Sequence, residues 1–250
     1  MGRAFEFRKE RKLKRWGHMA KTFTKIGKEI TIAVKQGGPD VVGNSRLRAL
    51  MAEARSENMP KDNVEKAIKR ALEKNQGDFK EVVFEGYGPH GIAYLVETAT
   101  DNNTRTVANV RSYFTKCGGS LGTSGSVSFM FDHKCVFRIK YKEGMDIDEL
   151  QLALCDCDDD PEVFIEEQED KDENITKNVV IYGAYESYGA IQKYIEDNGY
   201  ELISGGFERI PNVDLKDVTP EQRETLDKLT GLLEDDDDVT NVYSTLKPAE

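Results

Sequence analysis

The chain has no long apolar run and few residues that would anchor it to a membrane. No stretch of its 250 residues approaches the roughly 20 apolar residues that a membrane-spanning helix needs. No apolar segment follows the basic N-terminal tract, so we do not expect a secretory signal. Glu6 and Glu10 interrupt that tract, which disfavours a mitochondrial presequence. These absences predict a cytoplasmic protein that does not bind a membrane.

Cysteine and histidine are too sparse to suggest a metal site. The four cysteines, Cys117, Cys135, Cys155 and Cys157, form no CxxC pair, and we expect them to be reduced thiols in a reducing compartment. The acidic runs at 155–162 and 235–239 lack the D-x-D-x-D-G spacing of a calcium loop, so we expect them to be solvated turns. The sequence therefore predicts no metal and no cofactor.

The sequence also lacks the patterns of a catalytic site. Gly86, Gly88 and Gly91 follow an expected strand, but another strand comes next, whereas a phosphate-cradling loop leads into a helix N-terminus. The polar cluster at 101–105 contains no nucleophile–base pair. The three histidines lie in unrelated surroundings, and His90 is the one most worth mutating in a search for activity. We expect no catalytic residue, no small-molecule substrate and no enzymatic function.

What the chain does have is a strongly uneven distribution of charge. The whole chain has a formal net charge of −11. Residues 1–74 contain 19 Lys and Arg against 9 Asp and Glu, a net charge of +10, and the remainder contains 16 against 37, a net charge of −21. The stretch RKERKLKRWGHMAK, residues 8–21, has seven lysines and arginines, one histidine and one acid. Like charges packed so closely repel one another unless a polyanion neutralises them.

The charge pattern therefore predicts a nucleic-acid partner for the N-terminal part, while the acidic remainder limits indiscriminate binding. The alternative is that the basic side chains only solvate a helix. The candidate nucleic-acid-binding residues are Arg3, Arg8, Lys9, Arg11, Lys12, Lys14, Arg15, Lys21, Lys25 and Lys28. Trp16 is expected to anchor a core rather than to stack on a base.

Apolar periodicity predicts helices in the first third of the chain. A first helix ends at the QGGPD stretch, residues 36–40, a second begins near Asn44 or Ser45, and a third begins at Pro60. Together they are expected to form a small three-helix bundle.

The rest of the chain alternates between strands and helices. We expect strands at 81–88, 91–100 and 126–131 and a helix at 103–119, capped by Asn103 or Thr104. Residues 135–204 have the order β-α-β-β-α-β of a ferredoxin-like domain. The tail adds a strand at 207–211, a helix with a capping box at Thr219 and Gln222, and a strand at 239–246.

We therefore predict an α+β fold in which two α/β (ferredoxin-like) domains follow the three-helix bundle. A β-α-β tail cannot bury its own faces, so it is expected to complete the sheet that begins near residue 81, which places the third domain inside the second. The predicted domains are a basic helical domain at 1–78, a discontinuous α/β domain at 79–133 and 206–250, and an inserted ferredoxin-like domain at 134–205.

Four stretches together resemble one known family over nearly the whole chain. They are FTKIGKEITIAVKQGGPD at 23–40, NMPKDNVEKAIKRA at 58–71, the segment from FEGYGPHGI to SVSFMF at 84–131, and VTNVYSTL at 239–246. They are similar to the YebC/PmpR regulatory proteins, which include the mitochondrial translational activator of cytochrome c oxidase. The opening GRAFEFRKERKLKRWGHMAK departs from the GHSKW stretch that is commoner in the family.

The resemblance implies a helical domain and two α/β domains, with no catalytic activity. It implies a DNA-binding transcriptional regulator or, alternatively, a translation factor that acts on messenger RNA or the ribosome, where ribosomal proteins would also be partners. A protein-binding scaffold is the remaining alternative, since a fold alone does not determine function. The sequence contains no identifiable helix-turn-helix and no RNP aromatic motif, so it does not separate DNA from RNA.

Overall fold

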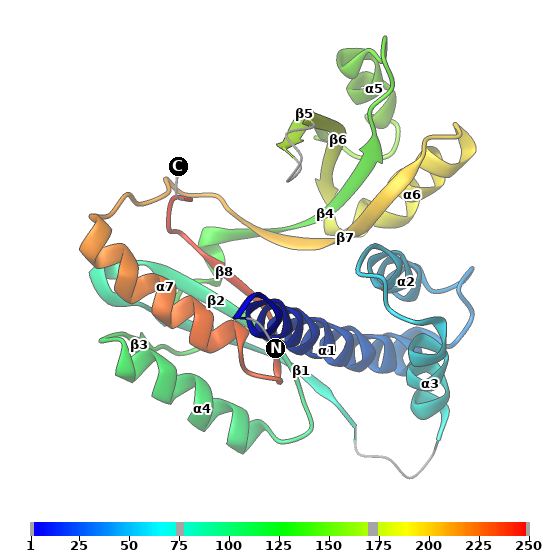
Figure 1. Ribbon diagram of the computed structural model, residues 1–250. Helices are drawn as coiled ribbons and strands as arrows, with labels where there is room; N and C mark the ends of the chain where they lie inside the picture. Colours follow the sequence, from blue (N-terminus) through cyan, green and yellow to red (C-terminus); the bar gives the residue numbers. More distant parts are fainter. Residues whose placement is uncertain (1–2, 74–77, 170–174, 249–250) are drawn as a thin grey trace. The chain divides into compact units, whose positions relative to one another are not determined.

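The computed structural model describes the backbone of residues 3–73, 78–169 and 175–248, and the side chains of residues 19–73, 78–167 and 177–248. Within these ranges the chain has the predicted α+β composition, with seven α-helices and two four-stranded sheets (Figure 1). It divides into two compact units. Unit 1 contains Met1–Gln36, Glu57–Phe131 and Pro211–Glu250, and unit 2 contains Gly37–Ser56 and Asp132–Ile210.

Unit 1 is built on a sheet with the strand order β3-β1-β2-β8. Its strands are β1 (Lys80–Tyr87), β2 (Ala93–Thr100), β3 (Ser120–Leu121) and β8 (Val239–Ser244). Its helices are α1 (Arg3–Gly37), α3 (Lys61–Leu72), α4 (Asn103–Lys116) and α7 (Pro220–Glu234). The tail strand β8 pairs antiparallel with β2, so segments more than 130 residues apart in the sequence share one sheet.

The central strand β2 is buried on both faces, which explains its unbroken apolar run. Tyr94 and Val96 pack with α4 and α7, where Phe114 and Leu229 are fully buried. On the opposite face Leu95 packs with residues that include Val127. A strand covered on both sides is apolar throughout rather than alternating.

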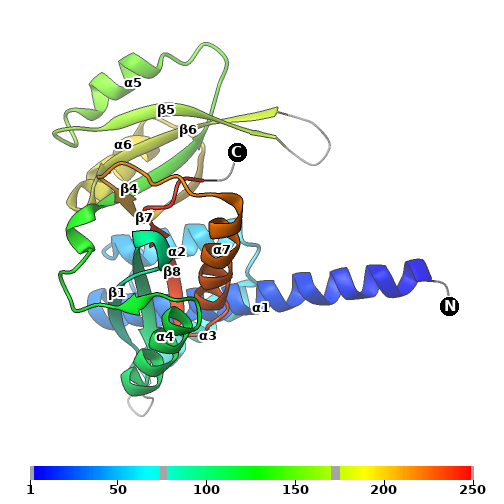
Figure 2. The ribbon, with the colours of Figure 1, turned by 90° about the vertical axis from the view of Figure 1, so that its left-hand side faces the viewer.

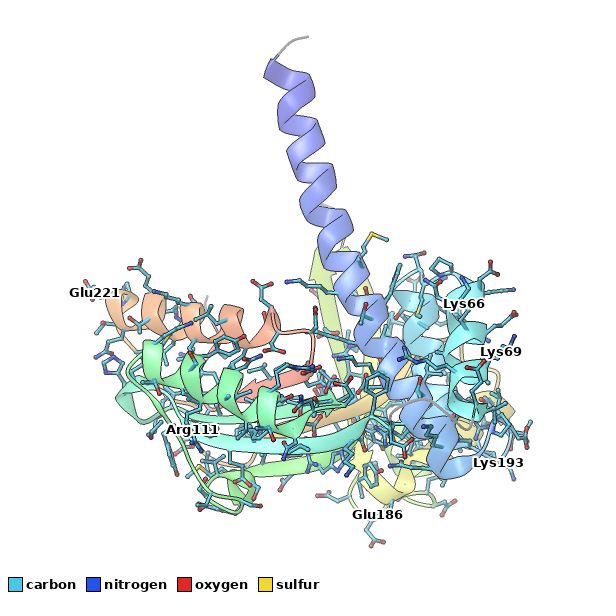
Figure 3. All side chains as sticks on the ribbon, turned by 90° about the horizontal axis from the view of Figure 1, so that it is seen from below. Lys66, Lys69, Arg111, Glu186, Lys193 and Glu221 are labelled. Carbon is cyan, nitrogen blue, oxygen red and sulfur yellow. The ribbon has the colours of Figure 1, made fainter. Side chains whose placement is uncertain are left out.

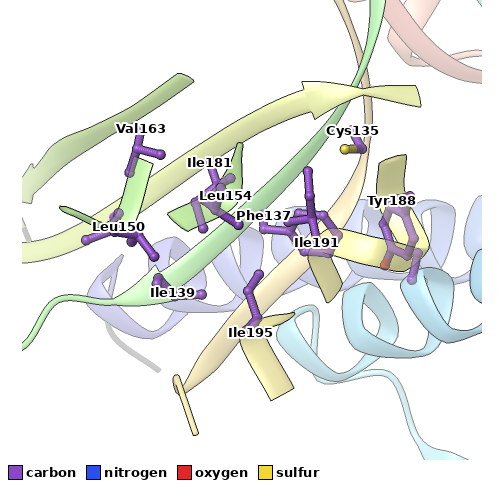
Figure 4. Packing of buried hydrophobic residues seen from close by; sticks show 12 residues of the cluster. Cys135, Phe137, Ile139, Leu150, Leu154, Val163, Ile181, Tyr188, Ile191 and Ile195 are labelled. Carbon is purple, nitrogen blue, oxygen red and sulfur yellow. The ribbon is translucent and has the colours of Figure 1, made fainter. Parts of the chain in front are cut away.

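Unit 2 contains α2 (Ser45–Ser56) and a second sheet with the order β5-β6-β4-β7. Its other elements are β4 (Phe131–Lys140), α5 (Ile147–Leu154), β5 (Glu162–Glu169), β6 (Ile175–Ala184), α6 (Tyr188–Asp197) and β7 (Leu202–Pro211). The chain order and the strand order together match the predicted ferredoxin-like plan. Phe137, Ile181 and Ile191 are fully buried in the core between the sheet and its helices (Figure 4).

Most predicted helix ends are confirmed. The Asn44 side chain accepts a hydrogen bond from the Leu47 amide at 3.0 Å, as predicted. Asp146 likewise caps α5 by accepting from the Glu149 amide at 3.1 Å. Thr219 and Gln222 form the predicted capping box. The cap predicted for α4 at Asn103 or Thr104 is wrong, because Asn102 caps the helix by accepting from the Arg105 amide.

Two predicted strand boundaries are also wrong. Residues 126–131 do not form a separate strand: Ser128–Met130 is a short 3-10 turn, and β4 begins at Phe131 and continues to Lys140. The last strand of the predicted β-α-β-β-α-β segment, which ends at residue 204, and the strand predicted at 207–211 are one strand, β7. Helix α2 belongs to unit 2, whereas α3 and all of α1 except its last residue belong to unit 1. The predicted domain boundaries stay a prediction.

Candidate nucleic-acid interface

Helix α1 carries all ten candidate phosphate-binding residues. Seven of them lie at positions where only the backbone is described, and their side chains lie outside the described residues: Arg3, Arg8, Lys9, Arg11, Lys12, Lys14 and Arg15. The helix is continuous through these positions, and its first half extends away from the sheet of unit 1 (Figure 2).

The other three candidates, Lys21, Lys25 and Lys28, contact the acidic segment that follows α7. The Lys21 Nζ lies 2.8 Å from the Asp235 carboxylate, and the Lys25 Nζ donates to the Glu234 carbonyl oxygen at 2.7 Å. These lysines recur every three or four residues, so they share one face of α1. That face therefore lies on the C-terminal end of α7, where unpaired carbonyl groups favour cations.

Lys28 makes the most buried of these contacts. Its Nζ donates to the Asp238 carboxylate at 2.7 Å and to the Asp237 carbonyl oxygen at 2.8 Å. Only 12% of the Lys28 side chain and 6% of the Asp238 side chain are exposed. As a phosphate ligand, Lys28 would first have to leave this partner.

Asp238 connects α1 with α4 and the first sheet. Besides Lys28, its carboxylate accepts hydrogen bonds from Arg105 at 2.6 Å and from Thr106 at 2.9 Å. Thr100 at the end of β2 is a further partner at 3.2 Å. Burial by itself would raise the pKa of Asp238, but the hydrogen bonds from Lys28, Arg105 and Thr106 outweigh it and lower the pKa to about 2.

The solvated turn predicted at 235–239 is therefore wrong for two of its residues. Asp236 and Asp238 are both buried. Asp236 accepts from Asn109 at 3.1 Å and from the Tyr113 hydroxyl at 2.9 Å. The run of four aspartates is instead an internal partner for α1 and α4. The opposite charges of residues 1–74 and the tail were the only sequence signal for this pairing.

A loop that could have bound phosphate through its backbone is occupied by a side chain of the protein. Glu85 is 5% exposed, and its carboxylate accepts hydrogen bonds from the amides of Gly125, Val127 and Ser128 at 2.7, 2.7 and 2.8 Å. These amides are aimed at an internal anion, so this loop does not offer them to a phosphate.

A groove lies between α1, α3 and the start of β1. It has a volume of about 440 Å³. Phe23 and Gly27 line it from α1, and Lys66 and Arg70 from α3, while Phe79 lies beside it just before β1. Sequence reasoning missed this groove, because its five residues come from three segments of the chain that only the fold brings together.

The described residues hold neither a metal-like cluster nor a helix suited to a bilayer. No group of three or more His, Cys, Asp or Glu within the described ranges is arranged to bind a metal ion. No helix in the same ranges is both long and apolar enough to cross a membrane. His90 is exposed in a turn with φ of 62°, and the His133 ring stacks on Tyr185 at 4.1 Å.

Comparison with known proteins gives a consistent result over the whole chain. A family model described as "TACO1/YebC protein N-terminal domain" matches residues 3–74, and one described as "TACO1/YebC second and third domain" matches residues 79–246. A probable transcriptional regulatory protein of Parabacteroides distasonis is 61% identical over 247 residues, which cover 99% of this chain and 97% of that relative. One of the same name from Bacteroides thetaiotaomicron is 59% identical over 250 residues, 100% of this chain and 98% of that relative.

A solved structure shares the fold. The crystal structure of a conserved hypothetical protein from Aquifex aeolicus superposes with a TM-score of 0.74 at 32% sequence identity. The match covers 92% of this chain and 91% of the other.

Proposed function

The chain belongs to the TACO1/YebC family, and on that premise we propose that it is a non-enzymatic, nucleic-acid-binding regulator of gene expression that acts on DNA in the cytoplasm. The names of its relatives, probable transcriptional regulatory proteins, support a role in regulation. The observation that carries the proposal is the net charge of +10 on residues 1–74 of an otherwise acidic chain. Such a segment attracts a polyanion by counterion release.

In this proposal the two halves of α1 have different tasks. The lysines of the second half hold the helix against Glu234–Asp238, as the contacts of Lys21, Lys25 and Lys28 indicate. The first half carries the seven cations between positions 3 and 15. A helix rises about 1.5 Å per residue, so these positions extend over roughly 18 Å, or about five base pairs of a duplex.

The acidic remainder gives the second candidate function its support. Residues 75–250 have a net charge of −21, which suits contact with basic proteins such as those of the ribosome. In that case the N-terminal helix would bind ribosomal or messenger RNA, and the protein would regulate translation.

The two candidates are separated by measuring binding to duplex DNA and co-sedimentation with ribosomes at the same salt concentration. If the protein is a transcriptional regulator, it should bind duplex DNA at least as tightly as it binds ribosomes. Added duplex DNA should then release it from the ribosome pellet into the supernatant. Co-sedimentation that DNA does not reverse would favour the translation factor. Binding to neither would overturn the proposed function.

A further inference from the structure

We propose that the groove between α1 and α3 binds one unpaired nucleotide of a single-stranded nucleic acid. This inference rests on the proposed function and makes it more specific, because it names the form of nucleic acid and a second contact surface. None of the groove residues except Lys28 is among the candidates that the charge pattern gave.

The floor of the groove is open because α1 has a glycine where a side chain would otherwise stand. A glycine inside a helix is less stable than an alanine at the same position. A Cβ placed at Gly27 would meet no atom within 4 Å, so no packing neighbour requires the glycine. Its effect is to leave space unfilled in the groove that Phe23 and Phe79 also line.

The walls combine aromatic and cationic groups in the way that a nucleotide requires. The Arg70 guanidinium lies 5.3 Å from the centre of the Phe79 ring, and the Lys28 Nζ lies 5.5 Å from it. Lys66 is one turn from Arg70 on α3, and both are exposed at the rim. Among the described residues that line the groove, three are cationic and none is acidic.

Since Asp238 already neutralises Lys28, Lys66 and Arg70 are the cations available to a ligand phosphate. The groove is within the usual range for one small ligand, about 300–1,000 Å³, and is too small for a base pair with its backbones. Bases stack on aromatic rings only where they are unpaired, and basic grooves lined with aromatic residues bind single strands in this way.

The test compares affinities for a 12-nucleotide oligo(dT), a 12-nucleotide oligo(rU) and a 12-base-pair DNA duplex by fluorescence anisotropy. Gly27→Met fills the groove without changing charge, and Phe79→Ala removes the ring. Each variant should lose roughly five- to hundredfold affinity for single strands and keep its duplex affinity within about twofold. Thermal unfolding of each variant verifies that it is folded.

The charged rim has a matched control on the same helix. Lys66 and Lys69 are both exposed on α3 (Figure 3), but only Lys66 lines the groove. Lys66→Ala should reduce the single-strand salt slope by roughly 0.7, and Lys69→Ala should leave it unchanged. A loss of affinity for either oligonucleotide supports nucleotide binding in the groove. A larger loss on oligo(dT) indicates that the groove binds DNA, and a larger loss on oligo(rU) indicates that it binds RNA.

The failure of this inference is distinguishable from that of the proposed function. If the wild-type protein binds duplex and single strands but Gly27→Met and Phe79→Ala bind both as the wild type does, the groove assignment is overturned and the role of α1 stands. If the wild type binds no nucleic acid, both fall.

Discussion

At the scale of single residues, Lys21 and Lys28 make similar contacts in different surroundings. The Lys21–Asp235 pair is exposed, with 39% and 78% of its side chains accessible, whereas the Lys28–Asp238 pair is buried. Exposed pairs contribute about 0–1 kcal/mol, and a hydrogen bond to a buried charge contributes about 1.5–3 kcal/mol. We predict that Lys28→Met lowers the free energy of unfolding by about 1.5–3 kcal/mol and Lys21→Met by less than about 1 kcal/mol, measured by urea titration. Equal losses would contradict this account of α1.

Asp238 should also give the stability a dependence on pH. Its pKa is lowered to about 2, below the value of about 3.9 expected in the unfolded chain. The ionised carboxylate therefore stabilises the fold fully above about pH 4, and this contribution disappears as the pH falls to about 2. The difference in unfolding free energy between the wild type and Asp238→Asn should be constant from pH 7 to 5 and shrink below pH 4. A difference that is as large at pH 2 as at pH 7 would show that the charge is not responsible.

Glu85 is the residue on which the loop at 122–128 depends. Burial would raise its pKa, but the three amide hydrogen bonds outweigh burial and lower it. Glu85→Gln replaces an ionised acceptor of three bonds by a neutral amide, so we predict a loss of about 1.5–3 kcal/mol and faster amide exchange at Gly125, Val127 and Ser128. Glu81→Gln, at an exposed position of the same strand, should leave amide exchange at these three residues unchanged.

At the scale of secondary-structure elements, the sequence predicted the helices and the ferredoxin-like order but not where some strands begin and end. The predicted domain boundary falls between Gly205 and Gly206, yet β7 passes through both residues. A Cβ at Gly205 would lie 2.9 Å from the Phe137 ring, so the glycine allows the strand to cross an aromatic side chain. The first residues of the strand predicted at 126–131 do not form a strand, because the Val127 and Ser128 amides donate to Glu85 instead of to a neighbouring strand.

The inserted ferredoxin-like element provides its own test. Its core residues come from β4 to β7 and from α5 and α6, with Ala49 of α2 packed against them. We predict that residues 132–210 expressed alone unfold cooperatively, whereas residues 206–250 alone do not fold, because the leucines of α7 pack on Tyr94 and Phe114. Circular dichroism during thermal unfolding measures both, and a cooperative transition of the 206–250 peptide would contradict the discontinuous domain.

At the scale of the whole molecule, the sequence showed that basic and acidic residues are separated along the chain. It did not show that some of them pair with one another inside the fold. The sequence predicted a basic N-terminal helix and an acidic remainder. The tertiary contact between α1 and the end of α7, over 200 residues away in the sequence, determines which lysines contact the protein's own carboxylates. The α1–α3 groove depends in the same way on residues brought together from distant positions.

The central claim, that the first half of α1 binds phosphates, is tested most directly by the salt dependence of nucleic-acid binding. Each phosphate contact contributes roughly 0.9 to the log–log slope for duplex DNA and roughly 0.7 for single strands. Replacing Arg11, Lys14 and Arg15 together by alanine should flatten the slope on duplex DNA by about two to three units, to a similar extent for unrelated sequences. A triple variant that keeps the wild-type slope and affinity on both DNA and RNA would contradict the account. It would indicate that these side chains only solvate the helix.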